Sequence, residues 1–211
     1  MMRAALALHE VTGEPSYRRD AEAWRDVLLD QFMVEDAGCL AMTARGADPL
    51  VVRPQPTHDE AVPNANGVFA AALVRLAQIT ESEADHRRAA DMLTRLLGVA
   101  RASPLGHVSI LNALDLHLRG LSIVVTGEGA QALLDAALRI PYPERSARWL
   151  RPGEILDDNH PAKALSASGR GPQALVCAGM RCSLPVTDAD ALREQARAML
   201  SSGDGTGGAP P

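Results

Sequence analysis

The sequence predicts a mainly α protein made of αα-hairpins, with a β-hairpin insertion and a small C-terminal α/β element. Alanine and leucine dominate, and charged residues, 22% of the chain, alternate with them at helical spacing. Aromatic residues are only 3%, but 46% hydrophobic residues in a chain of 211 are enough for a real core. Beyond residue 100, short apolar runs typical of buried strands interrupt the helical pattern.

Two similar pairs of helices are expected in the first 120 residues. Apolar positions recur every three or four residues through 2–10 and 15–32, with "TGEP" between them. The segment 71–100 repeats this layout after about 69 residues. That spacing is too long for a solenoid repeat but suits a helical hairpin followed by a long loop. The matching positions are Thr12 with Thr80, and Arg18-Arg19 with Arg87-Arg88.

The segment between the two pairs predicts a β-hairpin and then a helix start. "GCLAMTARGADPLVVRP" alternates and breaks at "ARGADP", which predicts strands near 39–43 and 49–53 in a hairpin at about 38–54. "QPTHDEAVPNANG" then leads to a helix beginning near Val68. Asn66 is the expected cap, because its side chain can accept from the first free backbone N–H groups.

The C-terminal part predicts a small α/β element. We expect residues 1–120 to form the helical-hairpin region and 121–200 to form an α/β extension of the same domain. The tail, 201–211, is too polar and glycine-rich to order itself. The expected elements are a helix at 105–119, a strand at 121–127, a helix at 129–139, strands at 147–152 and 173–178, and a helix from a Thr187/Asp188 cap to Leu200.

Composition excludes several classes of partner. A net charge of -5 and a pI near 5.7 do not provide the excess of positive charge that attracts nucleic acid or an anionic membrane. No run approaches the ~20 apolar residues of a membrane span, and His9 and Glu10 end the first apolar run before a signal-peptide core forms. Three scattered cysteines indicate a reduced, cytoplasmic chain. We expect no cofactor.

Cys177 and Cys182 have four residues between them. A redox pair usually has two, with a thiolate at a helix N-terminus, whereas here the next helix begins about five residues later. A structural zinc site needs four ligands, and only Cys39 and scattered histidines are available to complete one. The favoured interpretation is two packed thiols and no metal; a metal site and a regulatory disulfide are the alternatives.

"VVTGEGAQA" resembles a dinucleotide-binding turn. Gly127, Gly129 and Ala132 follow a predicted strand and precede a predicted helix. That fingerprint also requires an acidic residue roughly 20 residues on, where "ARWLRP" supplies arginines. Glu128 would repel a pyrophosphate. A tight strand-to-helix turn is favoured over nucleotide binding.

Several motifs together resemble a known family. The run "RPQPTHDEAVPNANG" is similar to the "RP....D.A.PSGNS" signature of the thioredoxin domain-containing proteins related to spermatogenesis-associated protein 20. "ALD" at 113–115, "IVVTG", the cysteine spacing and "LPVTDADALREQ" match further signatures in the same order. The resemblance covers nearly all of residues 1–200.

This resemblance implies an (α/α) toroid similar to N-acylglucosamine 2-epimerase and other six-hairpin, carbohydrate-active folds. The chain corresponds to the C-terminal part of such a toroid. It has no C-x-x-C motif, so it lacks the family's thioredoxin-like part. Because residue 2 already lies in a helical pattern, we expect a truncated ring with an uncovered apolar helix face that favours self-association.

The loop before residue 68 is the predicted site, because loops entering the inner helices of such toroids surround a cavity. Asp59 or Asp115 would act as an acid or base, with His58 as proton shuttle. The ligand would be a sugar-like small molecule, since polar groups concentrate here. The residues expected to bind it are Arg53, Asn64 and Asn66, with Glu60 at the rim.

A non-catalytic interpretation stands beside the enzymatic one. Asp59 and Asn66 would then hold the loop and cap the helix, and Asp115 would be solvated. The chain would be a helical module for partner binding or assembly. An enzyme should bring a carboxylate and a histidine, or two carboxylates, to one concave pocket, whereas a module should not.

Overall fold

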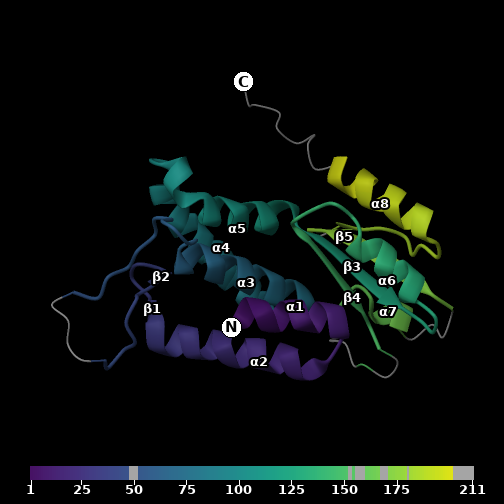
Figure 1. Cartoon of the computed structure of the whole chain (residues 1–211), viewed down its shortest axis with the longest axis horizontal. Helices are drawn as coiled ribbons and strands as arrows, with labels where there is room; N and C mark the ends of the chain where they lie inside the picture. Colours follow the sequence, from purple (N-terminus) through teal and green to yellow (C-terminus); the bar gives the residue numbers. More distant parts are fainter. Residues whose placement is uncertain (48–51, 152–153, 155–159, 167–170, 180, 202–211) are drawn as a thin grey trace. The chain divides into compact units, whose positions relative to one another are not determined.

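The computed structural model describes residues 1–47, 52–151, 154, 160–166, 171–179 and 181–201. It is 56% helical, with eight helices in the described residues and a small sheet, which confirms a mainly α fold (Figure 1). The chain divides into two compact units: residues 1–9 with 14–117, and residues 10–13 with 118 onward. No helix in the described ranges combines the length and the apolar character that a membrane crossing requires.

The first unit is built from helices. Pro15 stands at the start of α2, where its fixed φ suits the first helical turn. Ser82 caps α4 by accepting from the backbone N–H of Asp85 at 3.2 Å. The helices are α1 (Met2–Thr12), α2 (Pro15–Val27) with a π-helical turn (Leu28–Phe32), α3 (Ala65–Thr80), α4 (Glu83–Ala100), and α5 (Val108–Arg119) after a 3₁₀ turn (Pro104–His107).

Helix α3 is the centre of this unit's core. It is apolar on nearly every side, as expected of a helix that neighbours cover all round. Leu73 and Leu76 have no exposed surface, and Val74 has 1%. Only two residues join α3 to α4, and the two helices pack along each other, while α2 also contacts α3. The loops that precede α3 and α5 are therefore attached to a rigid helical base.

The predicted β-hairpin at 38–54 is wrong in position. Cys39–Leu40 (β2) pairs antiparallel with the preceding Met33–Val34 (β1), and no later strand pairs with it among the residues described. The turn between them contains Gly38 at φ 65°, a conformation that glycine adopts without steric cost. Most of the second expected strand, 49–53, lies outside the described residues, and Arg53 is in no strand.

The predicted cap of α3 is also wrong. Asn64, not Asn66, is the N-cap, and its side-chain oxygen accepts from the Gly67 N–H at 2.8 Å. The helix consequently begins at Ala65, three residues before the expected start at Val68. Asn66 is 1% exposed inside the first turn.

The second unit contains a four-stranded mixed sheet. Its order is β4-β3-β5-β6, with β3 parallel to β4 and antiparallel to β5. The expected strand at 173–178 is confirmed, whereas the one expected at 147–152 begins two residues earlier. The strands are β3 (Leu121–Thr126), β4 (Arg145–Trp149), β5 (Gln173–Ala178) and β6 (Arg181–Cys182).

Two helices, α6 (Gln131–Leu138) and α8 (Ala189–Ser201), cover one face of this sheet (Figure 1). Ile123 and Val125 face them, whereas Val124 packs on the other face beside the short helix α7 (Lys163–Ser166). Burial on both faces explains why β3 is a continuous apolar run. The expected start of α8 is confirmed, because the Asp188 carboxylate accepts from two N–H groups in the first turn.

Cys177 and Cys182 form a disulfide, so the favoured interpretation of two packed thiols is wrong. The two residues are directly opposite each other in the β5–β6 pair. Antiparallel pairing brings such side chains together, which their spacing alone does not reveal. Cys177 is buried and Cys182 is exposed.

Candidate ligand-binding site

Asp59 is the centre of a hydrogen-bond network at the start of α3 and α5. Its Oδ1 accepts from the backbone N–H and the side-chain amide of Asn64, both at 2.8 Å. Ser109 donates to it twice, from the hydroxyl to Oδ1 at 2.5 Å and from the backbone N–H to Oδ2 at 2.7 Å. The Asn64 amide also donates to the Ser109 hydroxyl at 2.7 Å. The carboxylate thus joins the loop to the first turn of α5.

The pKa of Asp59 is about 2, well below its ordinary value of 3.8. Burial alone would raise this pKa, but the hydrogen bonds from Ser109 and Asn64 favour the charged form and outweigh it. A general acid or base near neutral pH needs a pKa near the working pH. Asp59 remains ionised at neutral pH, as a hydrogen-bond acceptor in the network.

His58 lies next to this network without entering it. Its Nδ1 donates to the backbone carbonyl of Asp59 at 2.7 Å, not to the carboxylate. Nε2 lies against Gly106, where a Cβ atom would collide with the ring. The ring also meets His107 edge to face, with centroids 5.2 Å apart. Both ring nitrogens therefore face the protein's own atoms.

The remaining predicted site residues do not converge on Asp59. Arg53 donates to the carbonyls of Thr43, at 2.8 Å, and Gln31, at 3.4 Å. Asn66 bonds to the backbone of Leu40 and Pro56. Asp115 is six residues after Ser109 on α5, about 9 Å of helix rise away. The structure brings Asp59 and Asn64 together, with the His58 ring beside them on the Asp59 backbone carbonyl, and gives Arg53 and Asn66 other partners.

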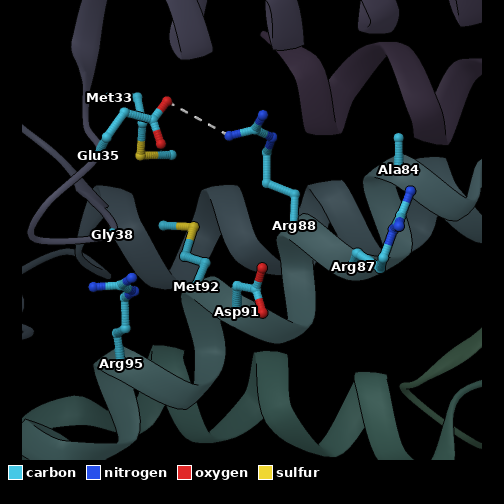
Figure 2. Close-up of a pocket in the computed structure, with 9 residues that line it drawn as sticks. All are labelled: Met33, Glu35, Gly38, Ala84, Arg87, Arg88, Asp91, Met92 and Arg95. Atoms are coloured by element: carbon cyan, nitrogen blue, oxygen red, sulfur yellow. Dashed lines mark ion pairs between the residues drawn. The ribbon is translucent and has the colours of Figure 1, made fainter.

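A groove elsewhere in the first unit, which we call the arginine groove, is lined by charged side chains. It has a volume of about 480 Å³ and lies between α4 and the β1–β2 turn (Figure 2). Met33 and Met92 lie at its base, where they are only 3% and 2% exposed, and Glu35 stands on the turn side. Its charged side chains on α4 are Arg87, Arg88, Asp91 and Arg95.

The arginines of this groove are held only by weak contacts. Figure 2 shows the Arg88 guanidinium directed towards the Glu35 carboxylate, 3.7 Å away, with side chains 41% and 71% exposed. Arg95 donates to the Asp36 carbonyl at 3.0 Å. Exposed pairs of this kind contribute about 0–1 kcal/mol. Each guanidinium has five N–H donors, so these contacts leave donors for a ligand.

Two features fix α4 beside the turn. Arg25 of α2 binds Asp85 at 2.7 Å, and Asp85 is 5% exposed in the first turn of α4. Burial alone would lower the pKa of Arg25, but the interactions with Asp26 and Asp85 raise it by more than burial lowers it. The pKa of Arg25 is therefore above its ordinary value. On the opposite wall, Gly38 leaves room for Arg95, whose side chain would collide with a Cβ at that position. In the sequence, Arg87 and Arg88 stand out as repeat positions, and the signal for the groove is the recurrence of charge at 87, 88, 91 and 95 on one helix.

In the second unit, the expected strand-to-helix turn is present at "VVTGEGAQA". Gly127 has φ 95°, and a Cβ there would lie 2.6 Å from the Gly171 carbonyl oxygen. A cavity of about 660 Å³ nearby is lined by uncharged residues, among them Gln173, Leu184 and Pro185. Across the described ranges, no group of three or more histidine, cysteine, aspartate or glutamate side chains is arranged to hold a metal ion.

The described residues form a mainly helical protein with a groove lined by arginines in its first unit. No protein-family model matches the chain, and no curated protein matches it. The resemblance carried by the "RP....D.A.P" run thus remains an expectation.

Proposed function

We propose that the first unit is a non-catalytic helical binding module that takes an anionic ligand in the arginine groove. The observation that carries this proposal is the gathering of Arg87, Arg88 and Arg95 along one wall, around the apolar side chain of Met92. The chain as a whole is acidic, with a net charge of -5, so this gathering does not follow from composition. Arginine is suited to carboxylate and phosphate because its planar fork can donate two parallel hydrogen bonds.

The Asp59 network favours a module over a carbohydrate-active enzyme. Asp59 accepts four internal hydrogen bonds, and its low pKa suits a permanent anion. His58 offers its Nδ1 proton to a backbone carbonyl. We infer that this cluster holds the loop and α5 in place, and that the helices belong to a partial (α/α) toroid of the kind the resemblance implies.

Binding of inorganic pyrophosphate, measured by isothermal titration calorimetry, tests the proposal. The double variant Arg88→Gln/Arg95→Gln should lose the heat of binding, because it removes two of the three cations. Arg19→Gln is the matched control, since Arg19 is an exposed arginine on α2. Binding should also weaken as salt rises, because exposed charges are screened.

Two results would contradict the module. One is equal pyrophosphate affinity in the wild type and the double variant, which would place the anion elsewhere. The other is turnover or binding of a sugar that Asp59→Asn abolishes without lowering the melting temperature, which would restore the carbohydrate-related function.

A further inference from the structure

The spacing of the arginines restricts the shape of the ligand. Arg88 and Arg95 are seven residues apart on α4, which puts them on one helix face with about 10 Å of rise between them. Met92 lies between them on the same face, four residues after Arg88 and three before Arg95. The groove therefore has two cationic positions with the uncharged, nearly buried Met92 between them.

The Asp91 carboxylate would repel a third anionic group placed between the two arginines. It lines the groove beside Met92, between the two arginines along the helix. A ligand that carried negative charge at its centre would meet this carboxylate. Met92 and Met33 add no charge to this middle part, and both are nearly buried, with 2% and 3% of their surface exposed.

Glu35 already places a carboxylate near one of the two cationic positions. Its side chain is 71% exposed and lies 3.7 Å from Arg88. The pair joins the β1–β2 turn to α4 across the groove (Figure 2). Because an exposed pair is weak, an anion that binds Arg88 through two hydrogen bonds can replace Glu35.

We propose that the arginine groove binds an elongated ligand with an anionic group at each end and an uncharged middle, and that Glu35 competes with one of those ends. This inference rests on the proposed function and adds the ligand's shape to it. Two sources share this chemistry. One is a long-chain dicarboxylate; the other is a peptide in polyproline II conformation with glutamates three residues apart, a spacing of about 9 Å.

Calorimetric titration with carboxylates of graded length tests the two-headed ligand. Nonanedioate, with two ends about 10 Å apart when extended, should bind the wild type at least about tenfold more tightly than butanedioate or nonanoate. Arg88→Gln and Arg95→Gln should each reduce nonanedioate to the affinity of nonanoate. Acetyl-Glu-Pro-Pro-Glu-amide is the peptide probe, and whichever of it and nonanedioate binds more tightly identifies the source.

Glu35→Gln tests the competition. Removing this charge should tighten nonanedioate binding up to about fivefold, the range that an exposed ion pair allows. Glu22→Gln is the matched control, because Glu22 pairs with Arg18 at 3.8 Å on α2 and neither residue lines the groove. Unchanged or weaker binding in Glu35→Gln would overturn the competitor role.

These titrations distinguish an error in the two-headed ligand from an error in the anion-binding module. If nonanedioate binds no better than nonanoate, but both lose affinity in Arg88→Gln/Arg95→Gln, the two-headed ligand is wrong and the anion-binding module stands. If neither nonanedioate, the peptide nor pyrophosphate binds the folded wild type, both are wrong.

Discussion

Asp59 and Ser109, fifty residues apart in sequence, are joined by two hydrogen bonds, one from the serine hydroxyl and one from its backbone N–H. The backbone bond satisfies an N–H in the first turn of α5 that has no partner within the helix. The carboxylate also lies at the positive end of the helix dipole. Asp59 is thus a helix cap supplied by a distant loop.

Replacing Asp59 with asparagine should destabilise the first unit. The change puts an amide group where the carboxylate accepts from four donors, and we expect a loss of about 1–3 kcal/mol in the free energy of unfolding. Urea denaturation followed by circular dichroism measures it. Asp20→Asn, at an exposed position of α2, should change little; equal stability of the two variants would contradict the structural role.

The same carboxylate predicts how stability depends on acid. Asp59 has a pKa of about 2 in the folded protein against an ordinary value of 3.8, so the unfolded chain binds the proton more readily. Its contribution is complete above about pH 4 and is lost as the pH falls through about 2. The difference in stability between wild type and Asp59→Asn should shrink over this window, and a difference that stays constant would be evidence against the assignment.

Gly38 predicts a link between the β1–β2 turn and the arginine groove. Gly38→Ala imposes a side chain at φ 65° and displaces Arg95, so nonanedioate affinity should fall several-fold and stability by about 1 kcal/mol. Gly98→Ala is the matched control, because a Cβ there meets nothing within 4 Å. Calorimetry measures the loss of nonanedioate affinity in the two variants, and thermal melts measure the loss of stability. Full affinity in Gly38→Ala would show that Arg95 does not contact the ligand.

The disulfide predicts a response to reductant in the second unit. Reduction removes a cross-link that closes a short loop, which is worth about 2 kcal/mol by loop entropy. Dithiothreitol should lower the melting temperature of the wild type but not of Cys177→Ala/Cys182→Ala. A stoichiometric zinc content that the double variant loses would instead indicate a metal site.

The exposed apolar side chains of α2 predict self-association. Trp24 and Val27 are 42% and 43% exposed, and they lie three residues apart, on one face of the helix. Sedimentation velocity should show a concentration-dependent increase in mass that Trp24→Gln/Val27→Gln removes. Val99→Gln, at an exposed position of α4, is the control. A wild-type monomer at every concentration would refute this prediction.

The parts of the fold that the sequence predicted are those set by local periodicity. Helix α4 and strand β5 each carry enough apolar residues at one period to be recognised. The cap of α3 was missed because Asn64 and Asn66 are two residues apart and both suit the role. The choice between them depends on Asp59 and Ser109, and Ser109 is 45 residues from Asn64.

The candidate site was harder to predict for the same reason. Asp59 and Asn64 were both assigned to the loop before α3, but the hydrogen bonds that Ser109 of α5 makes with them could not be read from the sequence. The arginine groove depends on a turn that puts Glu35 opposite Arg88, 53 positions away in the sequence. Strands β1 and β2 have two residues each, too few for alternation to reveal the turn between them.

The side chain of Asn66 affects the loop-closure entropy of the segment between β2 and α3. Its side-chain amide accepts from the Leu40 N–H and donates to the Leu40 carbonyl, the two-way exchange that one strand residue makes with its neighbour. It also donates to the carbonyl of Pro56. Asn66 thereby contacts the chain at Leu40, 26 residues before it, and at Pro56, ten residues before it. These two contacts divide the connection between Leu40 and Asn66 into two smaller loops. Each smaller loop closes at its own entropic cost. A change in the length of the loop 41–55 therefore leaves the closure entropy of the loop 57–65, which contains Asp59, unaffected.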